Sequence, residues 1–253
     1  MRTAASKLLL VLAAVAAVVS SAAAQYITPI AQSARSGALG GSLLYFPGEQ
    51  CVAIDYRRGF MLAALADKTV RLQMAAGARG TALAAYSHHG DAMWHEQQAV
   101  VGYGLQAAEW LHVAVAARWL QRGVGDAHYE SRQWLAPSAL VQTFFGNTSL
   151  TLLGGTRPWD SDRPWRWHLQ AAYRPLPQWT AVAEWEGEER TRMRLGMEYA
   201  YDGSWFLRAG MATRPVVLIF GIGARRRHWS ADLAVEVHSV LGITPQTSLS
   251  LWF

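Results

Sequence analysis

The C-terminal quarter of the chain, residues 189–253, consists of long segments in which apolar and polar residues alternate. In the clearest segment, one parity carries Thr191, Met193, Leu195, Met197, Tyr199 and Tyr201, and the other carries Arg190, Arg192, Arg194, Gly196, Glu198 and Ala200. A period of two places these sets on opposite faces of a β-strand. Strands of soluble sandwiches usually have about five or six residues, whereas these runs have about ten or more, the length with which a tilted strand crosses a bilayer. The pattern predicts an all-β fold, a closed antiparallel transmembrane β-barrel.

Residues 1–24 have the parts of a secretory signal peptide. Arg2 and Lys7 form a basic start, Leu8–Val19 form an apolar run, and Ala22–Ala24 form a small-residue cleavage site. The apolar run is too short to span a membrane as a helix. We therefore expect Sec export and insertion into the outer membrane of a Gram-negative bacterium, with both ends of the mature chain in the periplasm.

Residues 25–48 do not alternate cleanly and contain the small-residue stretch Ser33–Gly41. We expect this segment to form a plug in the periplasmic mouth of the barrel, and a disordered leader is the alternative. Residues 49–253 then form the barrel as one domain. Cys51 is the single cysteine and has no partner for an internal disulfide, so the closed hydrogen-bond ladder must stabilise the fold.

The barrel segment contains about fourteen strand-like runs, and an even number places both chain ends on one side. The runs lie near 51–57, 69–76, 79–87, 94–106, 109–121, 131–145, 148–157, 164–174, 178–187, 189–202, 204–214, 216–226, 228–239 and 245–253. Twelve strands are the alternative, if the first two runs belong to the plug. Short connections at Gly77, Gly146 and Gly203 alternate with mostly longer ones, as expected for periplasmic turns and outer loops.

Alternation also assigns a set of polar residues to the lumen. These are Arg166, His168, Glu184, Arg192, Arg194, Glu198, Arg208, Arg225, Asp232 and Glu236. Because the set mixes both signs, its members either neutralise one another across neighbouring strands or form a polar path or ligand site whose selectivity they set. The earlier strands carry many small residues, which leave room for a plug or an apolar ligand, or suit packing against a partner protein.

The charge and the tryptophans of the chain both fit a membrane barrel. The formal net charge is +5, but the arginines are spread over alternating positions, so we do not expect nucleic acid as a partner. The excess charge suits anionic lipid or lipopolysaccharide, or a polar lumen. Several tryptophans lie at or near the ends of the strand-like runs, where aromatic girdles form: Trp94, Trp110, Trp119, Trp165, Trp179, Trp205 and Trp229.

Catalytic and metal-binding patterns are weak. His228, Ser230 and Asp232 share one strand face, and a His-x-Ser pair occurs in outer-membrane lipases, but no oxyanion donor can be identified. The histidines near residues 88–95 lie in an expected outer loop, where a solvated polar tip explains them. We therefore expect a non-enzymatic protein without a cofactor or a bound metal ion.

Several stretches resemble a known family. They are Ser33–Gly41, Cys51–Phe60, Tyr86–Gly90 with His95 and Glu96, and His238–Phe253. Together they resemble PorV/PorQ-like proteins, a Bacteroidota branch of the FadL-like barrels. The resemblance implies a fourteen-stranded barrel with an N-terminal plug, which passes hydrophobic molecules or serves the type IX secretion machinery as a partner. Our first hypothesis is such a barrel, for small, partly apolar solutes or an envelope partner. A general diffusion porin is the alternative, and an outer-membrane lipase is the third hypothesis.

Overall fold

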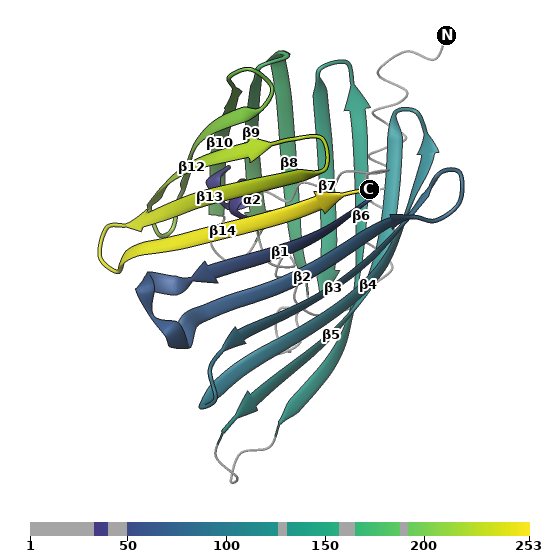
Figure 1. Ribbon diagram of the computed structural model, residues 1–253. Coiled ribbons are helices and arrows are strands. Elements are labelled where there is room, and N and C mark those ends of the chain that lie inside the picture. The colour runs from purple at the N-terminus through teal and green to yellow at the C-terminus, as the bar shows by residue number, and fades with distance from the viewer. Residues whose placement is uncertain (1–32, 40–49, 126–130, 157–164, 188–191) are drawn as a thin grey trace.

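The structure is a computed structural model that describes residues 33–39, 50–125, 131–156, 165–187 and 192–253. Within these ranges the chain forms fourteen strands, and each pairs antiparallel with the next (Figure 1). They are β1 (Cys51–Arg58), β2 (Ala66–Ala75), β3 (Gly80–Gly90), β4 (Trp94–Ala108), β5 (Leu111–Val124), β6 (Arg132–Phe145), β7 (Thr148–Thr156), β8 (Trp165–Leu176), β9 (Trp179–Gly187), β10 (Arg192–Ala200), β11 (Trp205–Ala212), β12 (Val217–Arg225), β13 (Trp229–His238) and β14 (Gly242–Trp252).

Strand β1 also pairs with β14, with Cys51 opposite Trp252, so the sheet closes on itself. Closure satisfies the backbone hydrogen bonds of both edge strands, as a membrane-spanning sheet requires. The prediction of a closed fourteen-stranded barrel is confirmed. The twelve-stranded alternative is wrong, because β1 and β2 are both part of the wall.

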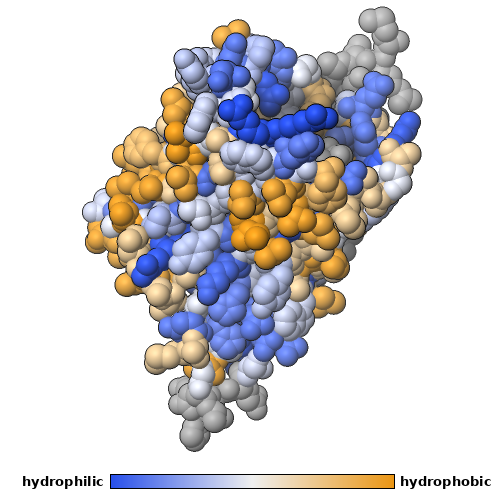
Figure 2. All heavy atoms as spheres, viewed as in Figure 1, coloured by the Kyte–Doolittle hydropathy of each residue, from blue (hydrophilic) through white to orange (hydrophobic). Residues whose placement is uncertain are grey.

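The two faces of the strands differ in the sense expected for a membrane barrel. Met193, Leu195 and Met197 on β10 are 36%, 43% and 48% exposed, whereas Arg194 and Glu198 between them are 6% and 4% exposed. This is the reverse of a soluble protein, in which charged groups are almost never buried unless paired. Figure 2 shows apolar side chains gathered across the middle of the visible surface, between more hydrophilic regions above and below.

Most of the tryptophans predicted to form girdles lie at strand ends in the structure. Trp94, Trp165, Trp179, Trp205 and Trp229 are the first residues of β4, β8, β9, β11 and β13. Trp110 lies in the turn between β4 and β5, but Trp119 lies well inside β5, so its predicted place at a strand end is wrong. Gly77, Gly146 and Gly203 have positive φ in their turns, a conformation that glycine adopts at no steric cost.

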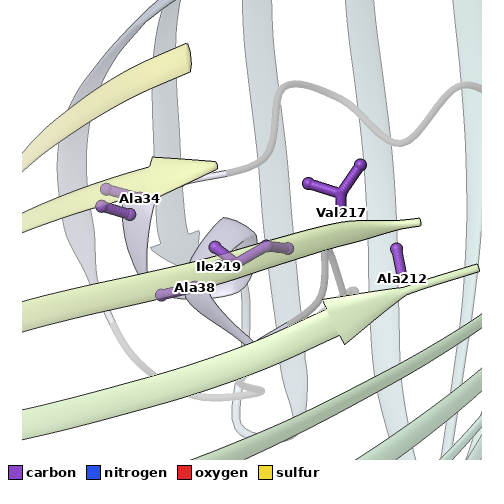
Figure 3. Close-up of a cluster of buried hydrophobic side chains, with 6 residues drawn as sticks. Ala34, Ala38, Ala212, Val217 and Ile219 are labelled. Atoms are coloured by element: carbon purple, nitrogen blue, oxygen red, sulfur yellow. The ribbon is translucent and has the colours of Figure 1, made fainter. Parts of the chain in front are cut away.

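A five-residue helix, α2 (Ala34–Ala38), lies against the inner face of the barrel beside β11 to β14 (Figure 1). The Ser33 side chain caps it by accepting a hydrogen bond from the Ser36 N–H. Figure 3 shows how the helix packs on the wall, and its buried cluster consists of Ala34, Ala38, Ala212, Val217, Ile219 and Ala234. Two wall glycines make this approach possible, because a Cβ at Gly196 or Gly221 would collide with Leu39 or Ala38.

The predicted signal peptide, residues 1–24, lies outside the described residues, and so does most of the predicted plug segment, residues 25–48. The longest fully described connection, from β1 to β2, holds two 3-10 turns, Gly59–Met61 and Ala63–Leu65. Among the described helices, none has the length and apolar character to span a membrane.

Candidate functional site

The inner face of the barrel is the candidate site, and it has two unlike parts. The first, which we call the charged wall, is the inner face of β8 to β14, β1 and β2. The second, which we call the small-residue wall, is the inner face of β3 to β7. Residues paired directly across antiparallel strands share a face, so the strand register assigns each residue to one wall or to the outside.

The first ion-pair group of the charged wall centres on Arg194. Its Nη1 donates to Glu184 Oε1 at 3.1 Å and its Nη2 donates to Glu186 Oε2 at 3.2 Å. His168 Nδ1 lies 3.2 Å from the same Glu184 oxygen. All four side chains are buried. One guanidinium thus pairs with two carboxylates from the neighbouring strand, and a buried charge needs a partner of this kind.

The second group centres on Arg208 and reaches the helix. Arg208 Nε donates to Glu198 Oε2 at 2.7 Å, and its Nη1 donates to Asp232 Oδ1 at 2.6 Å. Arg35 of α2 adds two bonds to Glu198, from Nε at 3.0 Å and Nη2 at 2.8 Å. Gly223 lies between β11 and β13, and a side chain there would collide with Arg208 and Asp232. The missing side chain lets the guanidinium lie across β12.

The third group holds the helix from the other side. The backbone N–H of Ala34 donates to Ser248 Oγ at 2.6 Å, and Ser248 Oγ donates to Asp55 Oδ1 at 2.6 Å. Arg71 Nε donates to the second Asp55 oxygen at 3.0 Å. Through Arg35 and Ala34, α2 is therefore tied to polar groups on β10 and β14.

The ten predicted lumen residues do not all take part in these groups. His168, Glu184, Arg194, Glu198, Arg208 and Asp232 do. Glu236 is half-buried and accepts from Arg57 at 3.0 Å and from Gln246. Arg225 is half-buried, with its guanidinium 4.6 Å from the centre of the Trp252 ring. Arg192 is half-buried opposite Glu186, and the Arg166 side chain lies outside the described residues.

The sequence pattern did not identify the partners from the beginning of the chain. Four residues from this part of the chain form ion pairs on the inner face but are not among the ten predicted lumen residues: Arg35, Asp55, Arg57 and Arg71. Alternation along β1 does place Asp55 and Arg57 on one face and could have found them. No local signal could have found Arg35, because its partner lies 163 residues away.

The small-residue wall has a different chemistry. Its central part is a patch that we call the apolar patch: Gly102, Ala114, Ala116, Leu140 and Leu153. All five residues are only partly buried although they lie on the inner face. Ala82 and Ala84, which also contribute to the small-residue pattern, share the outer parity with the exposed Tyr86 and do not belong to this wall.

The structure gives the catalytic and metal patterns little support. Asp232 binds Arg208, and His228 is exposed in the turn before β13. The His89 ring binds Asp67, and the rings of His88 and His95 stack at 6.0 Å. Within the described ranges, no group of three or more His, Cys, Asp or Glu residues could hold a metal ion.

The fold and the wall chemistry together define a barrel of the outer-membrane type, and comparison with solved structures agrees. The toluene transporter TodX of Pseudomonas putida matches with a TM-score of 0.61 and 11% identity, over 88% of this chain and 99% of that one. The toluene transporter TbuX of Ralstonia pickettii matches with a TM-score of 0.60 and 10% identity, over 87% and 97%. Omp33, an outer membrane protein of Acinetobacter baumannii, matches with a TM-score of 0.56 and 8% identity, over 81% and 98%.

At these identities the likeness concerns the fold alone. No protein-family model matches the sequence, and no curated protein sequence matches it. The resemblance to PorV/PorQ-like proteins of Bacteroidota therefore has no support from these comparisons, whereas similarity to transporter barrels of the outer membrane does.

Proposed function

We propose that the chain is a non-enzymatic outer-membrane channel that admits small, partly apolar solutes to the periplasm of a Gram-negative bacterium. Its exposed apolar side chains would contact lipid and lipopolysaccharide, and its inner face would contact the solute. The N-terminal segment with α2 would act as a plug that narrows the lumen on one side. This role needs no cofactor and no catalytic group.

The observation that carries the proposal is the difference in burial between the central ion-pair groups of the charged wall and the apolar patch of the small-residue wall. In the charged wall, the side chains of Arg194 and Arg208 and of the carboxylates that they bind are buried and form ion pairs. In the small-residue wall, Ala114, Ala116 and Leu140 keep part of their surface accessible. The transfer of an apolar solute from water to a partly exposed apolar surface inside a barrel is favourable.

The similar solved structures support the same class of solute. Two of them, TodX and TbuX, are toluene transporters, and both are similar to this chain along most of its length. The apolar patch lies inside the barrel, so the proposed ligand is a small molecule rather than a type IX secretion partner, which would have to dock on the outside or at a rim.

The test is entry of a hydrophobic dye into intact cells. A dye such as N-phenyl-1-naphthylamine is held back by an intact lipopolysaccharide leaflet and fluoresces when it reaches the membrane interior. Expression of the full chain in a Gram-negative host should increase the rate of entry. Ala116→Trp, which fills the apolar patch, should reduce that rate severalfold. Ala117→Trp is the matched control, because Ala117 is the next residue on β5 and is exposed on the outer face.

Entry that is unchanged by Ala116→Trp would reject the solute path. Conductance of the purified protein in planar bilayers provides the second measurement. A narrow barrel that holds a plug should conduct ions poorly, whereas a general diffusion porin would show large, regular steps in current. Large steps together with passage of sugars would replace our proposal by the porin alternative.

A further inference from the structure

A row of buried polar side chains crosses the inner face beside the apolar patch. His112 on β5 pairs with Gln142 on β6, and Gln142 pairs with Thr151 on β7. Thr151 pairs with Gln170 on β8, and Gln170 pairs with Glu184 on β9. We call His112, Gln142, Thr151 and Gln170 the polar row. It connects the small-residue wall to the Arg194 group of the charged wall.

The polar row is short of hydrogen-bond partners. Its four members are 3–7% exposed. Within the part of the chain that the structure describes, no partner reaches either ring nitrogen of His112, Oε1 of Gln142 or Nε2 of Gln170. The second carboxylate oxygen of Glu184, next in the row, has no partner there either. A buried polar group without a partner is destabilising, so several on one continuous row point to a bound molecule that supplies the missing hydrogen bonds.

The polar row and the apolar patch lie side by side. Ala114, Leu140 and Leu153 each lie two residues from a member of the row on the same strand. At about 3.3 Å per residue, the two sets are about 7 Å apart. The ring of Phe144 also contacts the row, with its centre 5.0 Å from that of His112. A molecule the size of one aromatic ring could therefore touch both sets at once.

We propose that the polar row and the apolar patch together bind a small solute with an apolar body and one uncharged hydroxyl group, as in a phenol. The row offers a donor in the Gln170 amide, an acceptor in the Gln142 carbonyl, and a ring in His112 that can do either. A hydroxyl group is both donor and acceptor, so it matches this mixture. The row itself carries no carboxylate or guanidinium, and Arg194 beside it is already bound to Glu184 and Glu186.

This inference rests on the proposed function, since it names the kind of solute that the channel would hold on its way through. The proposed site differs from a purely apolar path, in which polar atoms beside the patch would weaken binding of the solute. A site that binds only hydrocarbons would place further apolar side chains at the positions of Gln142 and Gln170.

The test compares two probes that differ by one group, 4-fluorophenol and 4-fluorotoluene. Their binding to the purified full chain in detergent micelles can be followed by fluorine NMR, with empty micelles as the blank. We expect 4-fluorophenol to bind more tightly. Gln142→Leu should weaken its binding by about fivefold, the value of one hydrogen bond, and should leave 4-fluorotoluene unchanged. Gln121→Leu is the matched control, because Gln121 lies on β5 outside the row and bonds Ser131 at the exposed rim.

The outcomes separate this inference from the proposed function. Equal affinity for the two probes, or an equal loss of affinity for both in Gln142→Leu, would overturn the inference. Absence of saturable 4-fluorophenol binding would mean that the row is hydrated by water only, and would also overturn it. If Gln142→Leu does not fold, as judged by heat-dependent electrophoretic mobility, Thr151→Val and His112→Phe make the same comparison. Dye entry without selective phenol binding removes the inference alone, and selective phenol binding without dye entry removes the proposed function alone.

Discussion

The two walls of the lumen differ in what their side chains contact. In the charged wall, arginines bind carboxylates from nearby strands at 2.6–3.3 Å, and two of these groups also hold α2. In the small-residue wall, the residues of the apolar patch are short or apolar and stay partly exposed. The difference indicates that the charged side chains inside this barrel mainly stabilise its structure. The groups that alternation marks as lumen polar are largely used to fix the wall and the helix, which leaves the inner face of β3 to β7 for a solute.

Loss of a buried cation from the charged wall should have the largest effect. Arg194→Leu removes the arginine that Glu184 and Glu186 share, and both carboxylates remain buried. Breaking such a pair from one side typically costs about 3–5 kcal/mol. Urea unfolding in lipid vesicles, followed by tryptophan fluorescence, should show this loss. Arg226→Leu at the exposed turn before β13 is the control. A loss as small as that of the control would show that the charged wall is not held together by its ion pairs.

A charge placed on the lipid face should cost slightly less. Leu195→Arg puts an arginine on the exposed face of β10, for which about 2–4 kcal/mol is expected near the bilayer midplane. Alternation alone suggests that Arg194→Leu is the milder change of the two, and the contacts of Arg194 reverse that order. Both variants can be compared in the same unfolding experiment. If Leu195→Arg is harmless in lipid, the outer face of β10 is not in the membrane.

This reversal shows how far the sequence could predict the structure. The face of Leu195 follows from a period of two, a local property, and so do the strand limits within a few residues. The partners of Arg194 depend on the register between β9 and β10, which no local pattern contains. The bridge from Arg208 to Asp232 crosses an intervening strand and depends on Gly223. Likewise, His112 and Gln142 form part of a polar row only once β5 and β6 are aligned.

Release of α2 should have a moderate effect on stability and a clear effect on the lumen. Arg35→Ala removes the two hydrogen bonds from the helix to Glu198, which keeps Arg208 as a partner. Hydrogen bonds to charged groups contribute about 1.5–3 kcal/mol. We expect a loss in this range together with higher ion conductance in planar bilayers. Lys68→Ala on the exposed face of β2 is the control. Unchanged conductance would mean that the helix does not limit the lumen.

A pair of matched glycine substitutions compares the two walls most directly. Gly196→Ala places a Cβ into the backbone of Leu39, so either α2 or β10 must move, and overpacking of this kind costs about 1–3 kcal/mol. Gly102→Ala, on the same inner face but in the small-residue wall, places its Cβ 3.0 Å from that of Ala116 and 3.1 Å from the Val115 carbonyl oxygen. Its cost should stay below about 1 kcal/mol, because these contacts are less close than those at Gly196 and alanine lowers the entropy of the unfolded chain. Unfolding in urea measures both. Equal costs for the two substitutions would mean that the small-residue wall is packed as tightly as the charged one, and that no room for a solute exists beside it.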